Sequence, residues 1–582
     1  MTAPAGPTFS VRDIPFSYYG SWFDISPVLA ERVYANDLHL VSHQIGMHPI
    51  LSLIPWHDGA RIETRVVAAP HRLVWQHETG SIELAYERAD TVRIRGEAIG
   101  LRIRAAVKAL TPFAGTYLYR DPVDKSFVFT VYGTGRRYRV TVLTGTAIDV
   151  VGDQSVGSNE RALTLTADAA PWEVAIEEFE SSRSAYSAVA SFDEIVRAAQ
   201  SKFNTFVDAV APWRSERTPA AELAAYVLWS AAVLPAGFIG RPAILMSKHW
   251  MDKVWSWDHC FNAIALAGGL PDLAWDQFQL VFDHQDDLGG LPDSITHSEV
   301  LYNFVKPPIH GWALEKLRQS QHVEPTELLL AYRGLAKWTN YWLVMRRATG
   351  HVLCHYHHGN DSGWDNATTF DGERVVETSD LAAFLVLQTQ QLADLAAGLG
   401  LLTEVDHWAT VSEEMCAAML AQLWAGGTFV ALGAASGIAY SSSSLLDLMA
   451  IVLGPKLPDD VRAALASRIE AHLTVHGLAT ELVSSPEYRS DGYWRGPIWA
   501  PSTILVEDGL RRSGFVALAD EISSRFRALC ERSGFAENFD AETGDGLRDH
   551  AYTWTASSYL ILAAAHSRRH PTAAVPEHAA SQ

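Results

Sequence analysis

The spacing of hydrophobic positions changes once along the chain, near residue 190. Before that point, short runs alternate between apolar and polar residues, as in SIELAYERA and KSFVFTVYG, and turn-forming residues separate them. Regularly spaced strands of this kind predict a β-sandwich over residues 1–190. From SFDEIVRAAQSKFNTFVDAVAPW onward the apolar residues recur at helical spacing, and segment 191–218 is expected to be a linker helix that closes at Pro212.

Helical spacing continues through residues 219–570, where about a dozen helices are expected. The loops between them are alternately short and long, an order that suits paired helices arranged around a ring. The long loops are rich in glycine and aromatic residues, and function is expected to lie there. Residues 571–582 predict a disordered tail. The expected helices span 219–235, 258–268, 271–287, 308–319, 325–348, 377–399, 403–424, 441–453, 458–475, 499–513, 516–532 and 552–568.

Composition narrows the class of partner. The formal net charge of −21 disfavours nucleic acid and anionic membranes. The four cysteines form no CxxC pair, which favours a reducing compartment over a disulfide framework or a zinc site. The start of the chain has no signal-peptide pattern and no apolar run reaches the roughly 18 residues of a membrane helix, so a cytoplasmic location is expected. The oligomeric state stays open.

Tryptophan is the unusual residue, with 19 in 582 positions. Several of these tryptophans lie at polar, glycine-containing positions rather than along helical stripes. Sugar rings present C–H faces that pack on aromatic side chains, so this enrichment points to carbohydrate. A large helical core also uses many tryptophans, and composition alone does not choose between the two interpretations.

Two carboxylates stand in aromatic, glycine-bearing loops: Asp365 in SGWDNATTF and Glu537 in AENFDAETGDG. Hydrolysis of a glycosidic bond needs one carboxylic acid to protonate the leaving oxygen and one carboxylate on the opposite face of the ring. Gly363 and Trp364 precede Asp365, and a tryptophan neighbour would raise the pKa of that carboxyl as a general acid requires. Taken singly, Asp365 also fits a turn aspartate and Glu537 a surface glutamate.

Two further motifs offer binding side chains. In KVWSWDHCFNAIAL, Trp255 and Trp257 would form a wall and Asp258 would bind sugar hydroxyls, although Asp258 also fits the N-cap of the helix that follows. In LYNFVKPPIHGWALEKL, Lys306 and His310 flank a double proline that starts a helix. Lys306 points either into a pocket or, as most such lysines do, into solvent.

The motif YWRGPIW lies between the two carboxylate loops and suits the lining of a sugar pocket. Arg495 would clamp hydroxyls or fix a carboxylate, and the glycine and proline after it make a rigid corner before the next helix. The tryptophans of this motif also fit a purely structural core. The candidate binding residues here are Tyr493, Trp494, Arg495, Gly496 and Trp499.

Together the motifs from about Trp250 to Leu560 resemble glycoside hydrolase family 63, whose clan includes the trehalases. The matching segments are WDHCFNAIAL, KPPIHGWA, SGWDN, YWRGPIW and ENFDAETGDG. The resemblance implies an all-α six-hairpin (α/α)6 barrel over 219–570 and agrees with an N-terminal β-sandwich. It also implies that Asp365 is the general acid and Glu537 the general base. By the same resemblance the pocket is shaped by Trp255, Asp258, Gly363, Tyr493, Trp494 and Trp499.

The chain departs from the glucosylglycerate and mannosylglycerate hydrolases that it resembles. Their pattern has a tyrosine where this chain has Met251 and a glutamine where it has Lys306, and it has an arginine in the helix after Thr378. These hydrolases also typically lack the N-terminal β region. The differences weaken the interpretation of a charged aglycone, although Lys306 could itself meet a carboxylate. A trehalase fits less well because its longer signature blocks are missing.

The function expected from the sequence is therefore an inverting exo-α-glycosidase, an α-glucosidase acting on a short α-glucoside without metal or cofactor. Inversion predicts that the Asp365 and Glu537 carboxyl groups lie roughly 6.5–9.5 Å apart, with a water between them and the sugar. The alternatives are a glucosylglycerate or mannosylglycerate hydrolase with the same carboxylates, a phosphorolytic enzyme, and a catalytically inactive carbohydrate-binding module. The sugar, the linkage and the role of the N-terminal region stay open.

Overall fold

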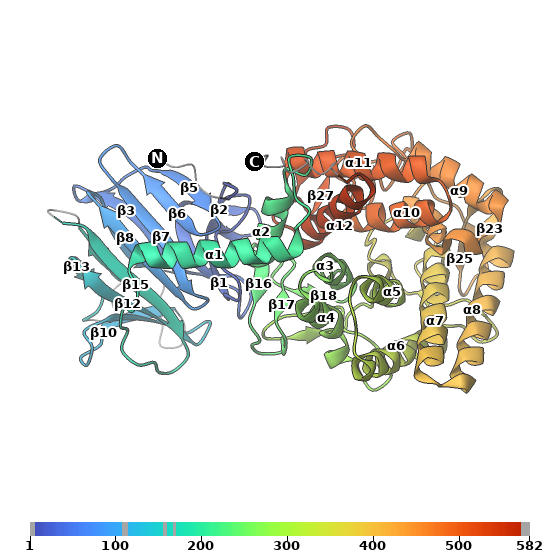
Figure 1. Ribbon diagram of the computed structural model, residues 1–582, viewed down its shortest axis with the longest axis horizontal. Coiled ribbons are helices and arrows are strands. Elements are labelled where there is room, and N and C mark those ends of the chain that lie inside the picture. The colour runs from blue at the N-terminus through green and yellow to red at the C-terminus, as the bar shows by residue number, and fades with distance from the viewer. Residues whose placement is uncertain (1–5, 108–114, 155–159, 167–169, 572–582) are drawn as a thin grey trace, which may run out of the picture.

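The computed structural model describes residues 6–107, 115–154, 160–166 and 170–571. A β-sheet-rich N-terminal region is followed by a helical C-terminal region, and the two lie side by side (Figure 1). The predicted order of a β part and a helical part is thereby confirmed. The predicted disordered tail falls, apart from Pro571, outside the described residues. No helix of the described part is long and apolar enough to cross a membrane.

The N-terminal region is built from two antiparallel sheets. The first has the order β1-β2-β3-β9-β14-β13, with β4 paired to β3, and the second has the order β10-β11-β12-β15-β8-β7-β6-β5. The strands of the first sheet are β1 (Phe23–Ala30), β2 (Val33–Ser42), β3 (His48–His57), β4 (Ala60–Arg61), β9 (Gly100–Ala105), β13 (Ala147–Val151) and β14 (Ala162–Leu165). Those of the second are β5 (Arg65–Ala69), β6 (Arg72–Gln76), β7 (Ser81–Arg88), β8 (Thr91–Glu97), β10 (Thr116–Arg120), β11 (Phe127–Val131), β12 (Arg136–Thr144) and β15 (Trp172–Phe179).

Alternation along the strands sets which side chains form the core. On β7, Ile82 and Leu84 are fully buried, whereas Glu83 between them is not. This period of two places one apolar face of the strand inward. Glycine is required where Trp172 packs on β8, because a Cβ at Gly96 would lie 2.3 Å from the indole ring.

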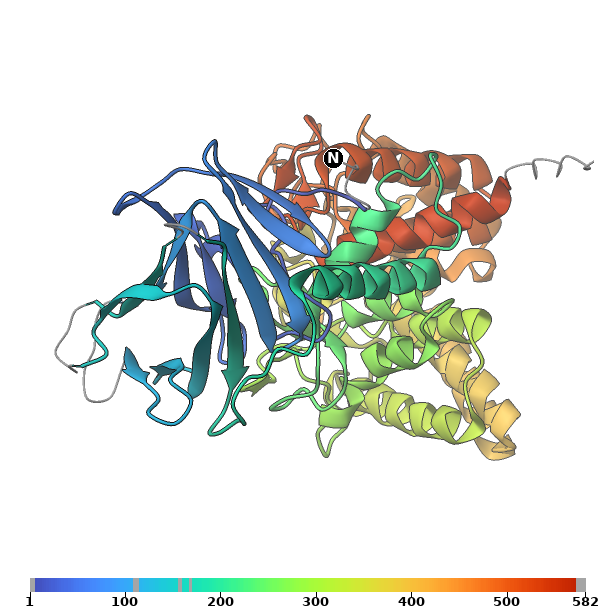
Figure 2. The ribbon, with the colours of Figure 1, turned by 60° about the vertical axis from the view of Figure 1, so that its left-hand side comes forward.

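Helix α1 (Phe192–Val210) joins the two regions and runs between them in Figure 2. Its start is fixed by a capping box in which the Ser191 and Glu194 side chains each bond to the other's backbone N–H. Phe203 and Phe206 lie on the buried face of α1 and pack on Trp229 and Tyr19, respectively. The helix ends at Val210, before Pro212, so the predicted linker 191–218 is helical over its first part.

Except for the helix predicted over 271–287, the α-helices of the C-terminal region begin and end within a few residues of the predicted bounds. They are α2 (Ala221–Ala231), α3 (His259–Leu266), α4 (Pro271–Gln279), α5 (His310–Ser320), α6 (Pro325–Met345), α7 (Ser379–Leu399), α8 (Leu402–Leu423), α9 (Asp459–Ala471), α10 (Ala500–Arg512), α11 (Val516–Ser533) and α12 (Thr553–Arg569). Short 3-10 segments are η1 (Phe282–His284), η2 (Gly359–Ser362) and η3 (Thr368–Phe370), and a longer one is η4 (Leu445–Lys456). Short strands in the loops are β16 (Ala232–Val233), β17 (Ala243–Ile244), β18 (Val254–Trp255), β19 (Ser294–Ile295), β20 (Val300–Leu301), β21 (His355–Tyr356), β22 (Val376–Glu377), β23 (Trp424–Ala425), β24 (Thr428–Phe429), β25 (Ala431–Gly433), β26 (Ala439–Tyr440), β27 (Asn538–Phe539) and β28 (Gly546–Leu547).

Two predicted helices were wrong in type or length. The segment predicted as helix 441–453 is the 3-10 run η4, which begins only at Leu445 because the Ser442 and Ser444 side chains bond to nearby backbone N–H groups. The helix predicted over 271–287 stops at Gln279, and the Asp286 side chain binds the backbone of Leu288 and Gly290 in a turn.

Contacts between the helical segments close on themselves. Following the contacts leads from α12 to α3, α5, α7, η4 and α10, and back to α12. The remaining helices contact this series from outside, for example α8 against α7 and α11 against α10 (Figure 1). The long loops therefore gather at the ends of the closed series, where the motifs of the sequence lie.

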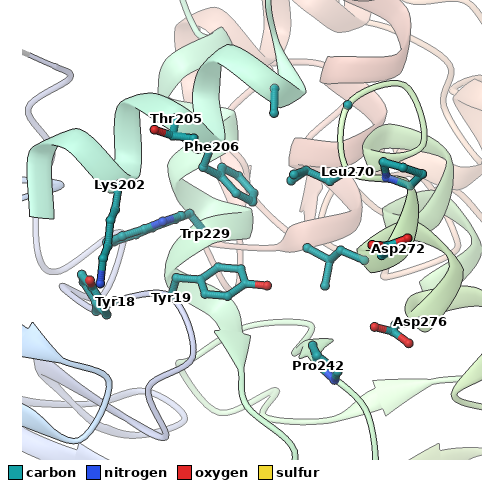
Figure 3. A pocket seen from close by; sticks show the side chains of 14 residues that line it. Tyr18, Tyr19, Lys202, Thr205, Phe206, Trp229, Pro242, Leu270, Asp272 and Asp276 are labelled. Carbon is teal, nitrogen blue, oxygen red and sulfur yellow. The ribbon is translucent and has the colours of Figure 1, made fainter.

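A cavity of about 790 Å³ lies at the junction between the two regions (Figure 3). Its walls come from Tyr18 and Tyr19, from α1, from Trp229 on α2 and from the start of α4. The carboxylate of Asp276 at its edge is held by Arg241 at 3.2 Å. This cavity is aromatic, but the two predicted catalytic carboxylates do not line it.

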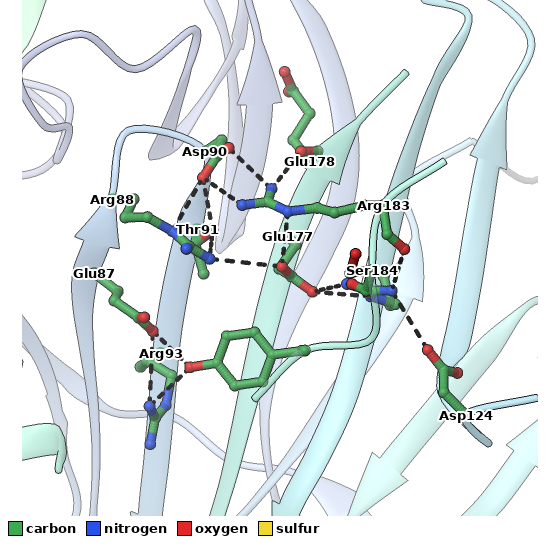
Figure 4. A network of polar contacts seen from close by, with 12 residues as sticks. Glu87, Arg88, Asp90, Thr91, Arg93, Asp124, Glu177, Glu178, Arg183 and Ser184 are labelled. Carbon is green, nitrogen blue, oxygen red and sulfur yellow. Dashed lines mark hydrogen bonds and ion pairs between the residues drawn. The ribbon is translucent and has the colours of Figure 1, made fainter. Parts of the chain in front are cut away.

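A buried ionic network fastens the end of the β region to its second sheet (Figure 4). Glu177 on β15 is 1% exposed and binds Arg139 of β12 through two hydrogen bonds of 2.8 and 2.6 Å. Arg183, in the segment that leads to α1, pairs with the other oxygen of Glu177 at 3.1 Å. Arg139 also donates to the backbone carbonyl of Ser184. The segment before α1 is thus fixed to the sheet by a carboxylate between two guanidinium groups.

Replacing Glu177 by Gln removes the carboxylate that Arg139 and Arg183 share, and leaves the buried Arg139 with only the longer pair to Asp124, at 3.4 Å. We expect the free energy of unfolding to fall by about 3 kcal/mol, measured by urea denaturation. Asp459→Asn breaks the exposed pair with Arg462 and is the matched control, with an expected change below about 0.5 kcal/mol. Equal losses for the two variants would contradict this account of the network.

Candidate active site

A cavity of about 90 Å³ lies among the long loops at one end of the helical region. The loops before α3, α5, α10 and α12 and the turn after η2 all contribute to its wall. The predicted site residues that line it are Trp255, Trp257, Asp258, Lys306, Gly363, Asp365, Tyr493, Trp494 and Trp499. Motifs far apart in the sequence are therefore brought together around one small space.

Aromatic side chains form most of the wall, and several of its tryptophans pack on one another. Trp494 and Trp499 stack with ring centroids 4.0 Å apart and an interplanar angle of 6°. Trp554 meets Trp257 and Trp499 edge-on, each at 5.6 Å. Trp364 does not line the cavity but lies behind Trp494, with ring centroids 4.6 Å apart. Because Trp257, Trp494, Trp499 and Trp554 are each held by another ring, this part of the wall is well fixed.

Gly363 has two reasons to be glycine. Its φ of 73° lies in the left-handed region, which a side chain disfavours. A Cβ there would also lie 2.5 Å from the Trp257 ring. The turn that precedes Asp365 can therefore press directly against the tryptophan wall.

Asp258 stands at the start of α3 but does not act as its cap. Its side chain makes no capping hydrogen bond, and its Oδ2 is buried without a hydrogen-bond partner among the described residues. Burial raises the pKa of Asp258 to about 8, and the charge of Lys306 opposes the rise. The N-cap interpretation is wrong, and an unsatisfied carboxyl faces the cavity.

Lys306 is buried, with 7% of its surface exposed, so the interpretation as a solvated lysine is wrong. Its Nζ pairs with Asp293 at 3.2 Å and donates to the Asn360 carbonyl at 3.0 Å. Burial by itself lowers the pKa of Lys306, but the carboxylates of Asp293, Asp365 and Asp258 outweigh burial and raise it. This ammonium group therefore stays charged and balances the acidic side of the cavity.

Asp365 follows η2 in a turn that is fixed to the next loop. The neighbouring Asn366 donates to the Gly492 carbonyl and accepts from the Trp494 N–H, both at 3.0 Å. The turn therefore keeps its place relative to Trp494. Burial raises the pKa of the Asp365 carboxyl, and the positive charge of Lys306 opposes the rise.

Arg495, Gly496 and His310 lie outside the cavity wall. Arg495 donates to the Asn366 carbonyl at 2.7 Å and pairs with Asp371, so it holds the Asp365 turn from behind. Gly496 gives room to the Arg489 carbonyl, which would lie 2.2 Å from a Cβ there. His310 is fully buried and donates from Nε2 to the Ser256 carbonyl at 2.9 Å. All three position the loops that do line the cavity.

Glu537 is buried, with 1% of its surface exposed, so the surface interpretation is wrong. Neither carboxyl oxygen has a well-formed hydrogen bond to another described residue. Burial raises the pKa of Glu537 to about 8, and Asp549 adds to the rise. Arg548 and the Tyr493 hydroxyl act in the opposite direction. The backbone N–H of Glu537 is fixed by the Asp549 carbonyl at 2.6 Å.

The charges of Glu537 and Asp365 both affect Tyr493. The phenol of Tyr493 has its pKa raised well above the ordinary value, first by burial and then by the charges of Glu537 and Asp365. Tyr493 itself has a φ of 64°, a strained conformation for a residue with a side chain. Two carboxyls from loops far apart in the sequence therefore act on one tyrosine. Asp365 and Tyr493 line the cavity, whereas Glu537 is not among its lining residues.

Comparison with known proteins identifies the family. Residues 251–555, just over half of the chain, match the family model described as the mannosylglycerate hydrolase MGH1-like glycoside hydrolase domain. The chain belongs to this family of glycoside hydrolases. Mannosylglycerate hydrolase from Rubrobacter radiotolerans is 23% identical over 399 residues, covering 53% of this chain and 89% of the relative. A mannosylglycerate hydrolase from Thermus thermophilus is 39% identical over 78 residues, which cover 13% of this chain and 19% of that one.

Solved structures agree on the fold. The crystal structure of a family 63 mannosylglycerate hydrolase from Thermus thermophilus in complex with glucose matches with a TM-score of 0.51 and 20% identity. The match covers 58% of this chain and 98% of that one. The resemblance to glycoside hydrolase family 63 and the prediction of an enzyme are confirmed, and the fold is of the family 63 type.

The sequence did not reveal several groups at the site of this glycoside hydrolase. Met251, Tyr552 and Trp554 also line the cavity, and nearby Asp293 pairs with Lys306 and Asp549 with His249. Tyr552 and Trp554 stand in AYTWT, just before a helix, as Trp255 and Trp257 stand before α3. That pair of aromatic residues could have been recognised from the sequence. No local sequence pattern marks Asp293 or Asp549. No group of three or more metal-ligating side chains occurs among the described residues.

The raised pKa of Glu537 makes a prediction about stability. A carboxyl whose pKa rises to about 8 on folding favours the folded state at low pH, and this contribution is lost as the pH rises through 8. Glu537→Gln removes the titrating group, so its melting temperature should exceed that of the wild type at pH 9 by more than at pH 5. Thermal unfolding at both pH values checks this, with the exposed Glu542→Gln as control. A wild-type advantage that grows with pH would contradict the burial argument.

Proposed function

We propose that this glycoside hydrolase is an inverting exo-α-glycosidase, in which Asp365 is the general acid and Glu537 the general base. The observation that carries the proposal is that two desolvated carboxyls act on Tyr493: Asp365 lines the aromatic cavity together with Tyr493, and Glu537 is buried close enough to raise the pKa of the same phenol. Both carboxyls come from loops that the family resemblance assigns to catalysis. Their environments differ, because Lys306 is next to Asp365 whereas Asp549 and Arg548 are next to Glu537.

The reaction then needs one proton transfer at each carboxyl. The protonated Asp365 gives its proton to the glycosidic oxygen as the bond between that oxygen and the anomeric carbon breaks. Ionised Glu537 takes a proton from a water whose oxygen bonds to the anomeric carbon from the opposite face. The products are the free aglycone alcohol and a sugar with inverted anomeric configuration. Asp365 ends ionised and Glu537 protonated, and exchange with solvent restores the starting state.

The small cavity and its charges favour a short, neutral α-glucoside. The cavity is small, about 90 Å³, which suits a single terminal sugar and attack at the end of a chain. Asp258 and Asp365 line the cavity, and Lys306 is the one lysine or arginine among the described residues that line it. Since Lys306 already pairs with Asp293, it is not available as the anchor of a substrate carboxylate.

A second candidate substrate is mannosylglycerate or glucosylglycerate. The relatives that match this chain are mannosylglycerate hydrolases, and a solved neighbour with a TM-score of 0.50 is described in complex with Tris and D-glycerate. Assays with neutral disaccharides beside the two glycerate glycosides separate the candidates, because strict dependence on the aglycone carboxylate would select the second. Dependence on phosphate would select a phosphorolytic enzyme instead.

We also propose a finer architecture. The closed series of α12, α3, α5, α7, η4 and α10 supports an inner layer of an (α/α)6 barrel, with the other helices outside. The two antiparallel sheets support a β-sandwich. The proposed domains are the sandwich at 1–190, the linker at 191–218 and the barrel at 219–570.

Asp365→Asn and Glu537→Gln should each lower kcat by about 10³-fold or more while folding normally, because each removes a proton-transferring group. The measurement is turnover of the substrate found in the assays above. Glu542→Gln, on the Glu537 loop but exposed, is the control and should keep wild-type activity. If Asp365→Asn or Glu537→Gln kept near-full activity, that residue would not have the proposed role.

The pH dependence of kcat/KM should be bell-shaped. Its acid limb should lie near pH 8, because below that pH Glu537 holds its proton and cannot act as the base. Arg548→Gln removes a positive charge that lowers the pKa of Glu537, so this limb should move to higher pH. A profile of kcat/KM against pH for both enzymes checks the shift. A limb that moved to lower pH in the variant would contradict the assignment.

A further inference from the structure

A buried ionic contact links the N-terminal β region to the active site. His43, at the end of strand β2, is fully buried. Its Nε2 lies 2.7 Å from Asp24 Oδ2 on strand β1, and its Nδ1 lies 3.4 Å from Asp252 Oδ2 in the helical region. Both carboxylates are also buried. Burial alone would lower the pKa of His43, but the two carboxylates outweigh it and raise the pKa to about 9. The imidazole is therefore a cation shared between the two regions.

Asp252 belongs to a short loop that forms part of the active-site wall. The loop closes on itself, because the Met246 N–H donates to the Lys253 carbonyl at 2.8 Å and the Ser247 N–H to the Met251 carbonyl at 2.9 Å. Met251, next to Asp252, lines the cavity. We call residues 246–253 the bridging loop.

The bridging loop has a second anchor in the N-terminal region. Lys248 is buried and its Nζ donates to Ser17 Oγ at 3.0 Å and to the Ser21 carbonyl at 2.6 Å. A third donor bond reaches the Ala232 carbonyl. Lys248 and Asp252 thus hold both ends of the loop, and their partners His43, Ser17 and Ser21 all come from the N-terminal region.

The bridging loop in turn holds the group behind Glu537. His249 Nδ1 lies 2.9 Å from Asp549 Oδ1, and both side chains are buried. The Asp549 carbonyl accepts the Glu537 N–H at 2.6 Å, and the Asp549 charge raises the pKa of Glu537. A continuous set of contacts therefore leads from His43 through the bridging loop to Glu537.

We infer that His43 is a positioning residue for the active site: its pair with Asp252 holds the bridging loop so that Met251 stays in the cavity wall and His249 keeps Asp549 behind Glu537. The family match begins at residue 251, so His43, Asp24 and Lys248 lie outside the part of the chain that the family describes. The N-terminal region then supplies part of the active-site support rather than only a separate module. This inference rests on the proposed role of Glu537.

The test compares kcat and KM for the wild type, His43→Gln, Asp252→Asn and the double variant. Misplacement of the loop should lower kcat by about 10- to 100-fold in each single variant. The kcat of the double variant should be no lower than that of the less active single variant, because both changes break the same contact. The pH limb near 8 should also move to lower pH, since Asp549 would no longer be held where it raises the pKa of Glu537.

Glu177→Gln is the matched control, because it also breaks a buried ion pair of the N-terminal region but touches no residue of the bridging loop. It should keep kcat within about threefold of the wild type when both are assayed well below their melting temperatures. If His43→Gln does not fold, Asp252→Asn tests the same pair from the helical side. Single variants that lose stability but keep wild-type kcat and the same pH limb would overturn the inference.

Failure of the inference can be told apart from failure of the proposed function. Asp365→Asn and Glu537→Gln are assayed in the same series. If these two are inactive while His43→Gln and Asp252→Asn behave like Glu177→Gln, the catalytic pair stands and the positioning role falls. If Glu537→Gln is active, the proposed function falls with the inference.

Discussion

The site depends on keeping carboxyl groups out of water without giving them full hydrogen-bond partners. Burying an unpaired, ionised carboxyl costs free energy. Burial therefore raises the pKa of Asp258 and Glu537 to about 8, which favours their uncharged forms. The ammonium group of Lys306 lies among the carboxyls of Asp293, Asp365 and Asp258. Trp494 and Trp499 in the cavity wall, and Trp364 behind Trp494, are fixed by packing on one another.

The site is built from loops, so its geometry depends on the contacts that hold those loops in place. The loops are held by polar side chains that never reach the cavity: Asn366 ties the Asp365 turn to the Trp494 loop, and Arg495 supports the same turn from behind. The bridging loop extends this scheme to the N-terminal region through Lys248 and His43. The β region and the helical region therefore act as one structural unit at the active site.

Local patterns predicted much of this molecule. Alternating and helical spacing gave the two regions and most helix bounds, because each pattern reflects a face buried locally. The glycine-bearing aromatic loops likewise pointed to Asp365, Glu537 and the tryptophans around them. Contacts made at long range had no such signal: the pairing of His43 with Asp252 depends on how two regions dock. Lys306 was ambiguous for the same reason, since its burial depends on Asp293 and Asn360 in other loops. Arg495 belongs to the motif but faces Asp371, which spacing alone does not reveal.

The most direct test of the central claim is a proton NMR time course of the products formed from a panel of substrates: kojibiose, nigerose, maltose, isomaltose, trehalose, glucosylglycerate and mannosylglycerate. We expect hydrolysis in which the β-anomer of the released sugar appears first and the α-anomer grows in only by mutarotation. That result would establish inversion and identify the linkage. Appearance of the α-anomer first would contradict water activation by Glu537, and cleavage of no member would contradict the proposed class of substrate.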